Sequence, residues 1–451
     1  MEKFFKLKEN GTNVKTEVIA GITTFMTMAY ILAVNPNMLS ASGMDPTAVL
    51  IATCLASFVG TMCMALMANY PFALAPGMGL NAYFAYTVCI GMGYDWRVAL
   101  AAVAVEGVVF IVLSLTNVRE AIFNAIPSTL KKGVSAGIGL FIAFIGLQGA
   151  HLVVNNDSTL LSYVNFRGNF HTEGICAILA LIGLLITVIL YVKGIKASIL
   201  IGIIVTWVLG MICQAVGLYK VTPDAGFYSL YPTLGFTDFS KFGETFGQVF
   251  KADFSNVSIT NFIVVIFAFL FVDMFDTIGT LVGVATKAKM LDENEKLPRI
   301  RPALLADAIA TLLGAIFGTS TTTTYVESSA GVGAGARTGL ASVVTGFMFL
   351  LAIFFAPVFT AIPGFATAPA LIFVGFLMVM AVTEIKFEDV TESIPAYLCF
   401  LCMPLMYSIS ESIAIGVISY TLISVCCGKA KKVTPLMYIL TVLFNAKYIF
   451  L

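Results

Sequence analysis

Charge is scarce in this chain of 451 residues: Lys, Arg, Asp and Glu together make up 11% of it, and their signs balance to a formal net charge of zero. A soluble domain normally carries about 25% charged residues. Hydrophobic residues reach 59%, and the mean hydropathy is +0.96. These values exclude an ordinary soluble domain, and the balanced charge gives no sign of a nucleic-acid partner.

Histidine is almost missing, with two residues, and the sequence contains no His/Cys ligand cluster and no HExxH motif. We therefore expect no metal site, no cofactor and no enzyme activity. The nine cysteines lie mostly in apolar runs, and their odd number indicates free thiols that pack as small hydrophobes, Cys399-x-x-Cys402 included. The polar start of the chain, residues 1–17, has no signal-peptide core, so we expect the first span to direct its own insertion.

Apolar runs of spanning length recur along the whole chain, which is typical of a polytopic all-α membrane protein. A last apolar stretch, 436–451, is too short to count and is expected to lie at the interface or on the bundle. The runs predict about fourteen transmembrane spans, at residues 18–34, 48–68, 72–90, 98–116, 121–148, 174–192, 198–217, 261–285, 303–318, 320–335, 340–362, 367–383, 393–409 and 411–427.

The distribution of Lys and Arg predicts the orientation. With a cytoplasmic N-terminus, most of these residues fall in the inside loops, and an even number of spans then places both termini in the cytoplasm. The expected location is the plasma (inner) membrane. A long outside linker, 218–260, separates residues 1–217 from residues 261–428, and 429–451 form a cytoplasmic C-terminal tail. Seven spans on each side make the second half enter upside down, which is the inverted-repeat plan of many secondary transporters.

The eighth span carries two carboxylates, Asp273 and Asp276, in its middle and no Lys, Arg or His beside them. An ionisable group at the bilayer centre costs several kcal/mol, so it normally faces a cavity and has a function. Glu327, in the tenth span, is a third such carboxylate. We expect these acids to meet at one polar pocket that carries a small solute, with a structural hydrogen-bonding role as the alternative.

The third and tenth spans, at corresponding places in the two halves, are both expected to be broken. Pro76 and its glycine neighbours cannot lie in a continuous helix, so an extended piece followed by a half-helix near residues 79–81 is predicted. The Thr-rich run before Tyr325 favours an extended backbone in the same way. A plain kink, or packing of the hydroxyls between helices, is the alternative, and Asn81 could cap its half-helix or contact the solute.

Four motifs resemble the AzgA-like branch of the nucleobase–cation symporters, a family of hypoxanthine/adenine/guanine permeases. The resemblance implies fourteen spans in a seven-plus-seven inverted repeat, a core domain of spans 1–4 and 8–11, a gate domain of spans 5–7 and 12–14, and a homodimer. The motifs are GITTFMTMAYILAVNP at 21–36, APGMGLNAYF at 75–84, FVDMFDTIGTLVG at 271–283 and GTSTTTTYVESSAGVGAGARTGL at 318–340.

The same resemblance implies the site residues. Asp276 and Glu327 would bind the purine and handle the coupling proton, with Asp273 as an alternative or partner in both roles, and Thr280 stands where the related uracil permeases have a histidine. Other binding positions are Asn81, the backbone near Val326, and the wall residues Thr27 and Tyr30. The coupling ion is expected to be H⁺, with Na⁺ left open.

Rival interpretations are a permease of the same plan for uracil, xanthine or a small anion, a channel, and an intramembrane enzyme. An anion fits poorly, because the predicted pocket holds acids and no Lys or Arg. Isolated polar clusters at one depth fit a channel poorly. Glu106, Asp307 and Glu411 are expected to be structural or interfacial rather than part of the pocket.

Overall fold

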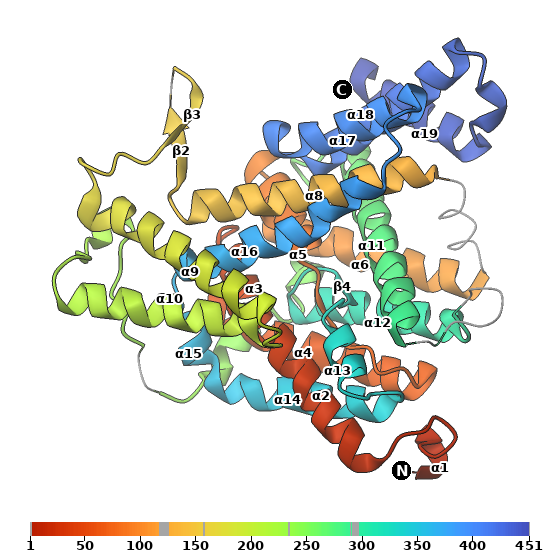
Figure 1. Cartoon of the computed structure of the whole chain (residues 1–451). Coiled ribbons are helices and arrows are strands. Elements are labelled where there is room, and N and C mark those ends of the chain that lie inside the picture. The colour runs from red at the N-terminus through yellow and green to blue at the C-terminus, as the bar shows by residue number, and fades with distance from the viewer. Residues whose placement is uncertain are drawn as a thin grey trace.

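The computed structural model of the chain describes residues 2–116, 126–156, 158–232, 235–288, 290 and 297–450. These residues are mostly helical, and ten of their helical stretches are long and apolar enough to cross a membrane (Figure 1). The predicted polytopic helical fold is confirmed. The count of fourteen stays a prediction, since broken and shorter apolar helices supply the remaining candidates.

The elements follow the predicted runs closely. In the first half the long helices are α2 (Val14–Met28), α3 (Ile31–Ser40), α4 (Pro46–Cys63), α6 (Trp96–Thr116), α8 (Ser128–Gly149), α9 (Ile175–Val192) and α10 (Ser198–Ala215). In the second half they are α11 (Ile259–Ala288), α12 (Ile300–Phe317), α14 (Gly339–Ala352), α16 (Gly364–Val379), α17 (Val390–Met406), α18 (Ile409–Cys426) and α19 (Pro435–Phe450). The short helix α15 (Ala356–Thr360) lies between α14 and α16. A short helix, α1 (Glu2–Phe5), precedes them.

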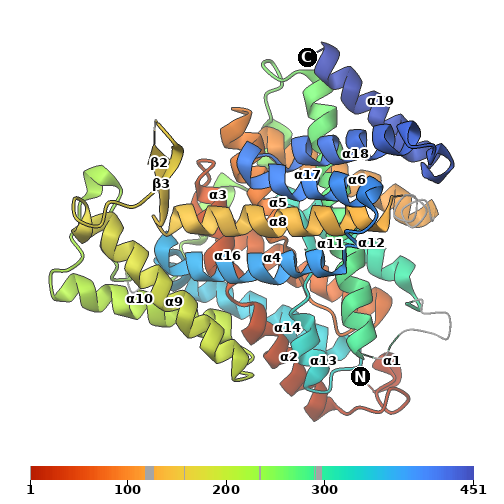
Figure 2. The same ribbon diagram turned by 45° about the horizontal axis from the view of Figure 1, so that its top comes forward.

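The helices pack as two groups. In the first, α12 packs on α4 and α6, α14 packs on α2 and α4, and α11 packs on α6. In the second, α8 packs along α16 and α17, α17 along α18, and α9 along α10 and α16, and these helices lie side by side in Figures 1 and 2. The groups correspond to the core and gate that the resemblance implied, and we use these names below.

Glycine allows a close helix crossing in the gate. A Cβ added at Gly139 of α8 would lie 2.6 Å from the carbonyl oxygen of Gly375 in α16, and one added at Gly375 would lie 2.5 Å from the carbonyl oxygen of Gly139. The two backbones are therefore in direct contact, as small residues permit between membrane helices.

The first span differs from the prediction, because it is two helices rather than one. α2 ends at Met28 and α3 begins at Ile31, with Ala29 and the fully buried Tyr30 between them. The Thr27 hydroxyl donates back to the carbonyl oxygens of Thr23 and Thr24, and such bonds often bend a helix. The sequence at this break carries no Pro or Gly, so it gave no sign of an interruption.

The connections are short or irregular. A hairpin of β2 (Val153–Asn156) and β3 (Leu160–Tyr163) follows α8, and the described parts of the 218–260 linker contain short 3₁₀ turns rather than long helices. One of these turns is joined to the core by the Gly247 amide, which donates to the carbonyl oxygen of Ile316 at 2.8 Å. All nine cysteines are free thiols, as predicted.

Candidate functional site

Two extended segments from opposite halves of the chain cross in the middle of the core. β1 (Leu74–Pro76) pairs antiparallel with β4 (Thr322–Thr324), with Ala75 opposite Thr323. Each strand runs into a short helix, α5 (Met78–Ala82) or α13 (Ser328–Gly333). The third and tenth spans are thus extended and then helical. The sequence predicted this form for each, but did not predict that they pair with each other.

The backbone pairing continues beyond the strands. The Gly77 amide donates to the Thr321 carbonyl at 3.0 Å, and the Tyr325 amide donates to the Ala73 carbonyl at 2.9 Å. The Tyr325 hydroxyl donates to the carbonyl of Pro76 at 2.5 Å. Non-helical backbone at membrane depth needs such partners, because lipid offers none.

Glu327 is the N-cap residue of α13 and contacts the first span. The Tyr30 hydroxyl, at the break between α2 and α3, donates to Glu327 Oε1 at 2.5 Å. Glu327 is partly exposed, and its neighbour Val326 has 51% of its surface exposed, whereas Tyr30 is fully buried. The carboxylate is therefore held from the protein side and open on the other.

Asp276 of α11 meets the same strand. The Thr323 hydroxyl donates to Asp276 Oδ2 at 3.4 Å, and Asp276 is only partly buried. Its carboxylate also interacts electrostatically with Glu327 and with Asp307. Acids from the eighth and tenth spans thus lie at one place beside β4, and two ionised carboxylates there would repel each other.

Asn81 is buried where the two broken spans join. Its side-chain oxygen accepts a hydrogen bond from the Ser320 hydroxyl, and its side-chain nitrogen lies 3.5 Å from the Pro76 carbonyl. The Asn81 amide donates to the Gly77 carbonyl at 2.8 Å. Asn81 lies inside α5, whose N-cap is Gly77, so its side chain does not cap the half-helix. It joins the two broken spans instead, and none of its surface is exposed.

Asp273 lies one turn from Asp276 but contacts different groups. The Thr277 hydroxyl is 2.7 Å from Asp273 Oδ1 and 3.0 Å from Asp307 Oδ1 of α12, and both acids are fully buried. Asp273 is therefore directed to the α11–α12 contact rather than to Glu327. Thr27 is buried and hydrogen-bonds within α2, as described above.

Hydroxyls of the Thr-rich run contact three polar side chains, of which the sequence analysis did not single out Asn35. Thr319 accepts from the Asn35 amide at 2.9 Å, Thr321 donates to Glu106 Oε2 at 2.7 Å, and Thr323 donates to Asp276. These three residues alternate with the others, so they point to one side of an extended chain. Residues 319–324 read TSTTTT, so the residue types show no alternation that could have predicted which hydroxyls make these contacts.

Comparison with known proteins agrees with this architecture. The family model described as "Permease family" matches residues 15–415, nearly the whole chain. The chain belongs to that family. Among curated relatives, the permease is 47% identical to the guanine/hypoxanthine permease PbuG of Bacillus subtilis, over 100% of both chains. It is 40% identical to the adenine permease AdeP of Escherichia coli, over 100% of this chain and 96% of AdeP. A putative permease of Methanocaldococcus jannaschii is 48% identical, over 100% of this chain and 98% of the relative.

Solved structures share the fold of this permease at low sequence identity. The transmembrane domain of the cyanobacterial bicarbonate transporter BicA aligns with a TM-score of 0.63 and 14% identity, covering 90% of this chain and 97% of that domain. The murine anion transporter Slc26a9, in its inward-facing state, aligns with a TM-score of 0.59 and 12% identity, covering 91% of this chain and 68% of the other. At these identities the likeness supports the fold alone.

Proposed function

We propose that this permease is a secondary transporter that imports purine nucleobases, namely hypoxanthine, guanine or adenine, by proton symport. The observation that carries the proposal is the meeting of Asp276 and Glu327, from opposite halves of the chain, beside two paired extended segments in the core. The substrate class comes from the relatives PbuG, a guanine/hypoxanthine permease, and AdeP, an adenine permease.

The chemistry of the site suits a flat, neutral solute rich in donors and acceptors. A carboxylate accepts hydrogen bonds from ring N–H or exocyclic amino groups. Backbone N–H groups near the exposed Val326 can donate hydrogen bonds to the ring nitrogens and carbonyl oxygens of the base. Such partners are needed because an unpaired polar group removed from water costs about 1–3 kcal/mol. The bonded contacts of Asn81 suit the support of the strands better than a direct contact with the base.

Proton coupling follows from the repulsion between the two acids. Binding one proton at Asp276 or Glu327 relieves that repulsion and leaves the other carboxylate to accept from the base. We infer that the proton and the base cross together. Asp273 would take part indirectly. The Thr277 hydroxyl links it to Asp307, and Asp307 interacts electrostatically with Asp276.

Movement of the core against the gate would expose the site to each side in turn. In this structure the two groups touch where the Thr87 hydroxyl donates to the Tyr407 carbonyl at 3.3 Å and the Tyr86 and Tyr407 rings meet edge to face at 6.0 Å. We further propose that the permease works as a homodimer in the plasma (inner) membrane, with its N-terminus in the cytoplasm.

The test is uptake of labelled hypoxanthine in cells that lack other purine permeases, in competition with adenine, guanine, xanthine and uracil, with and without a protonophore. We expect purines to compete, uracil not to compete, and the protonophore to abolish accumulation. The variant Glu327→Gln should lose accumulation, while Glu384→Gln, on the gate surface, should keep it. Competition by uracil alone, or accumulation that survives the protonophore, would contradict the proposal.

A further inference from the structure

The last helix, α19 (Pro435–Phe450), runs back along α18. The Thr441 hydroxyl donates to the Thr421 hydroxyl at 2.8 Å, and the Tyr448 hydroxyl donates to Glu411 Oε2 at 2.5 Å. Glu411 lies near the start of α18 and Thr421 near its end, so the two helices are antiparallel. Figures 1 and 2 show the same course, with the C-terminal end of α19 returning over α18.

The length of α19 is a large fraction of the thickness of the membrane. Glu411 and Thr421 are about 15 Å apart along α18, and α19 as a whole, at 16 residues, is about 24 Å long. The hydrocarbon core of a bilayer is about 30 Å thick, and a slightly short helix is accommodated by local thinning or by flanking polar residues.

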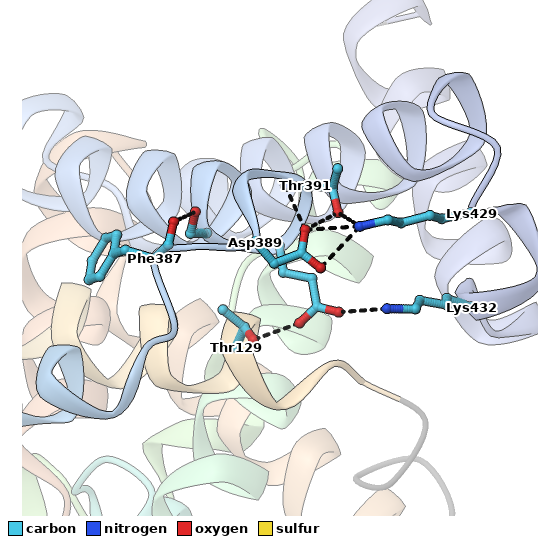
Figure 3. A network of polar contacts seen from close by, with 8 residues as sticks. Thr129, Phe387, Asp389, Thr391, Lys429 and Lys432 are labelled. Atoms are coloured by element: carbon cyan, nitrogen blue, oxygen red, sulfur yellow. Dashed lines mark hydrogen bonds and ion pairs between the residues drawn. The ribbon is translucent and has the colours of Figure 1, made fainter.

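The start of α19 is fixed at a polar boundary. Before it, Lys429 binds the Asp389 carboxylate at 2.9 and 3.0 Å and the Thr391 hydroxyl at 2.7 Å, while Lys432 lies 3.6 Å from Glu392 (Figure 3). Hydrogen bonds from Thr391 and Lys429 hold the pKa of Asp389 down at about 2. These charged, largely exposed groups lie at the end of α18 opposite Glu411.

The two faces of α19 are both apolar. Met437, Leu440 and Phe444 are buried, and the Phe444 ring lies 5.7 Å from the ring of Phe267 in the core helix α11. On the other face Val442 and Leu443 have 67% and 58% of their surface exposed. Leaving such side chains in water forfeits about 1.5–3 kcal/mol each relative to an apolar environment.

We infer that α19 is a further membrane-embedded helix, packed between α18 and α11, whose exposed face contacts phospholipid acyl chains. On α18, the apolar side chains of Leu422 and Val425 are also exposed. The start of α19 lies on the side of Lys429 and Lys432, and its end, near Tyr448, lies toward the opposite side. This arrangement replaces the cytoplasmic tail expected for residues 429–451, and it does not depend on the transported solute.

Paired fusions test the course of α19. Green fluorescent protein, which matures only in the cytoplasm, and alkaline phosphatase, active only outside it, are each joined after Lys432 and after Leu451. We expect fluorescence without phosphatase activity after Lys432, and the reverse after Leu451. Fluorescence at both positions would overturn the inference. Hypoxanthine uptake by each fusion shows that the rest of the permease is folded.

A spin label tests the occupant of the exposed face without a fusion. In a variant without native cysteines, Val442→Cys and the control Lys431→Cys are labelled in the reconstituted full chain, and collision rates with oxygen and with a water-soluble nickel complex are compared. High oxygen and low nickel accessibility at residue 442, with the reverse at residue 431, supports contact with acyl chains. Low accessibility to both at residue 442 would mean a protein partner, and high nickel accessibility would mean water; either result overturns the inference.

Discussion

Replacing Tyr30 by Phe tests the contribution of one hydrogen bond, from Tyr30 at the break in the first span to Glu327 in the tenth span. The substitution removes one hydroxyl, which donates to Glu327 Oε1 at 2.5 Å, and keeps a fully buried ring that leaves no cavity. A hydrogen bond to a charged group contributes about 1.5–3 kcal/mol. If the bond orients Glu327 for the base, that loss lowers uptake efficiency about 10- to 150-fold, at about 1.4 kcal/mol per factor of ten.

The assay is the initial rate of labelled hypoxanthine uptake, normalised to the amount of permease in the membrane. Tyr219→Phe is the matched control, because it removes a hydroxyl that donates at 2.8 Å to the carbonyl of Tyr228 in the 218–260 linker, and it should leave uptake unchanged. Equal size-exclusion profiles of the two variants in detergent would exclude misfolding. Uptake by Tyr30→Phe within twofold of the unaltered permease would refute the role given to this contact.

Three further outcomes are expected. Gly139→Ala should destabilise the folded permease by about 1–3 kcal/mol through overpacking, and so lower its melting temperature in detergent, because the added Cβ would lie 2.6 Å from a carbonyl oxygen of α16. Gly149→Ala is the control, since its Cβ would meet no atom within 4 Å. Equal losses of stability in the two variants would contradict the close crossing. Asn81→Ala should lower both melting temperature and uptake, since it leaves Ser320 without its acceptor; lost uptake with full stability would instead make Asn81 a binding residue. Because the Asp389 pKa is depressed to about 2, its stabilising contribution is present above about pH 4 and is lost as the pH falls toward 2. Melting temperatures measured from pH 5 downward should therefore drop less steeply in Asp389→Asn, and identical slopes would show that the contact with Lys429 is unimportant.

Composition and local chemistry predicted much of the fold. Low charge and recurrent apolar runs were enough for the helical membrane class, and Pro76 together with the Thr-rich run was enough for two extended segments. Their mutual pairing was not predictable, because β1 and β4 are about 250 residues apart and partner choice depends on the packed core. The break at Tyr30 was missed for a related reason: nothing local marks it, and the residue is held there by Glu327 from the other half of the chain.

The sequence predicted that acidic residues form the candidate site, but it did not predict the role of each one. Helix periodicity places Asp273 and Asp276 on similar faces, so the sequence left open which one serves the site. The contacts distinguish them, since Asp276 accepts from Thr323 of the strand and Asp273 meets Thr277 beside α12. Only tertiary packing carries that information, because one turn of helix is enough to direct two carboxylates to different neighbours.

The strand crossing also determines which parts of the permease can move. β1 and β4 come from opposite halves, yet backbone bonds at Gly77 and Tyr325 join them. The bond from Thr321 to Glu106 also joins the segment before β4 to α6. Separating the two strands would leave several buried donors and acceptors without partners, at about 1–3 kcal/mol each. By contrast, the hydrogen bonds recorded between the described parts of core and gate come from side chains: Thr87 to the Tyr407 carbonyl at 3.3 Å, Asn37 to the Ile362 carbonyl at 3.2 Å and Lys196 to the Ala330 carbonyl at 3.5 Å. We therefore expect the transport motion to occur between core and gate, with Asp276 and Glu327 carried together.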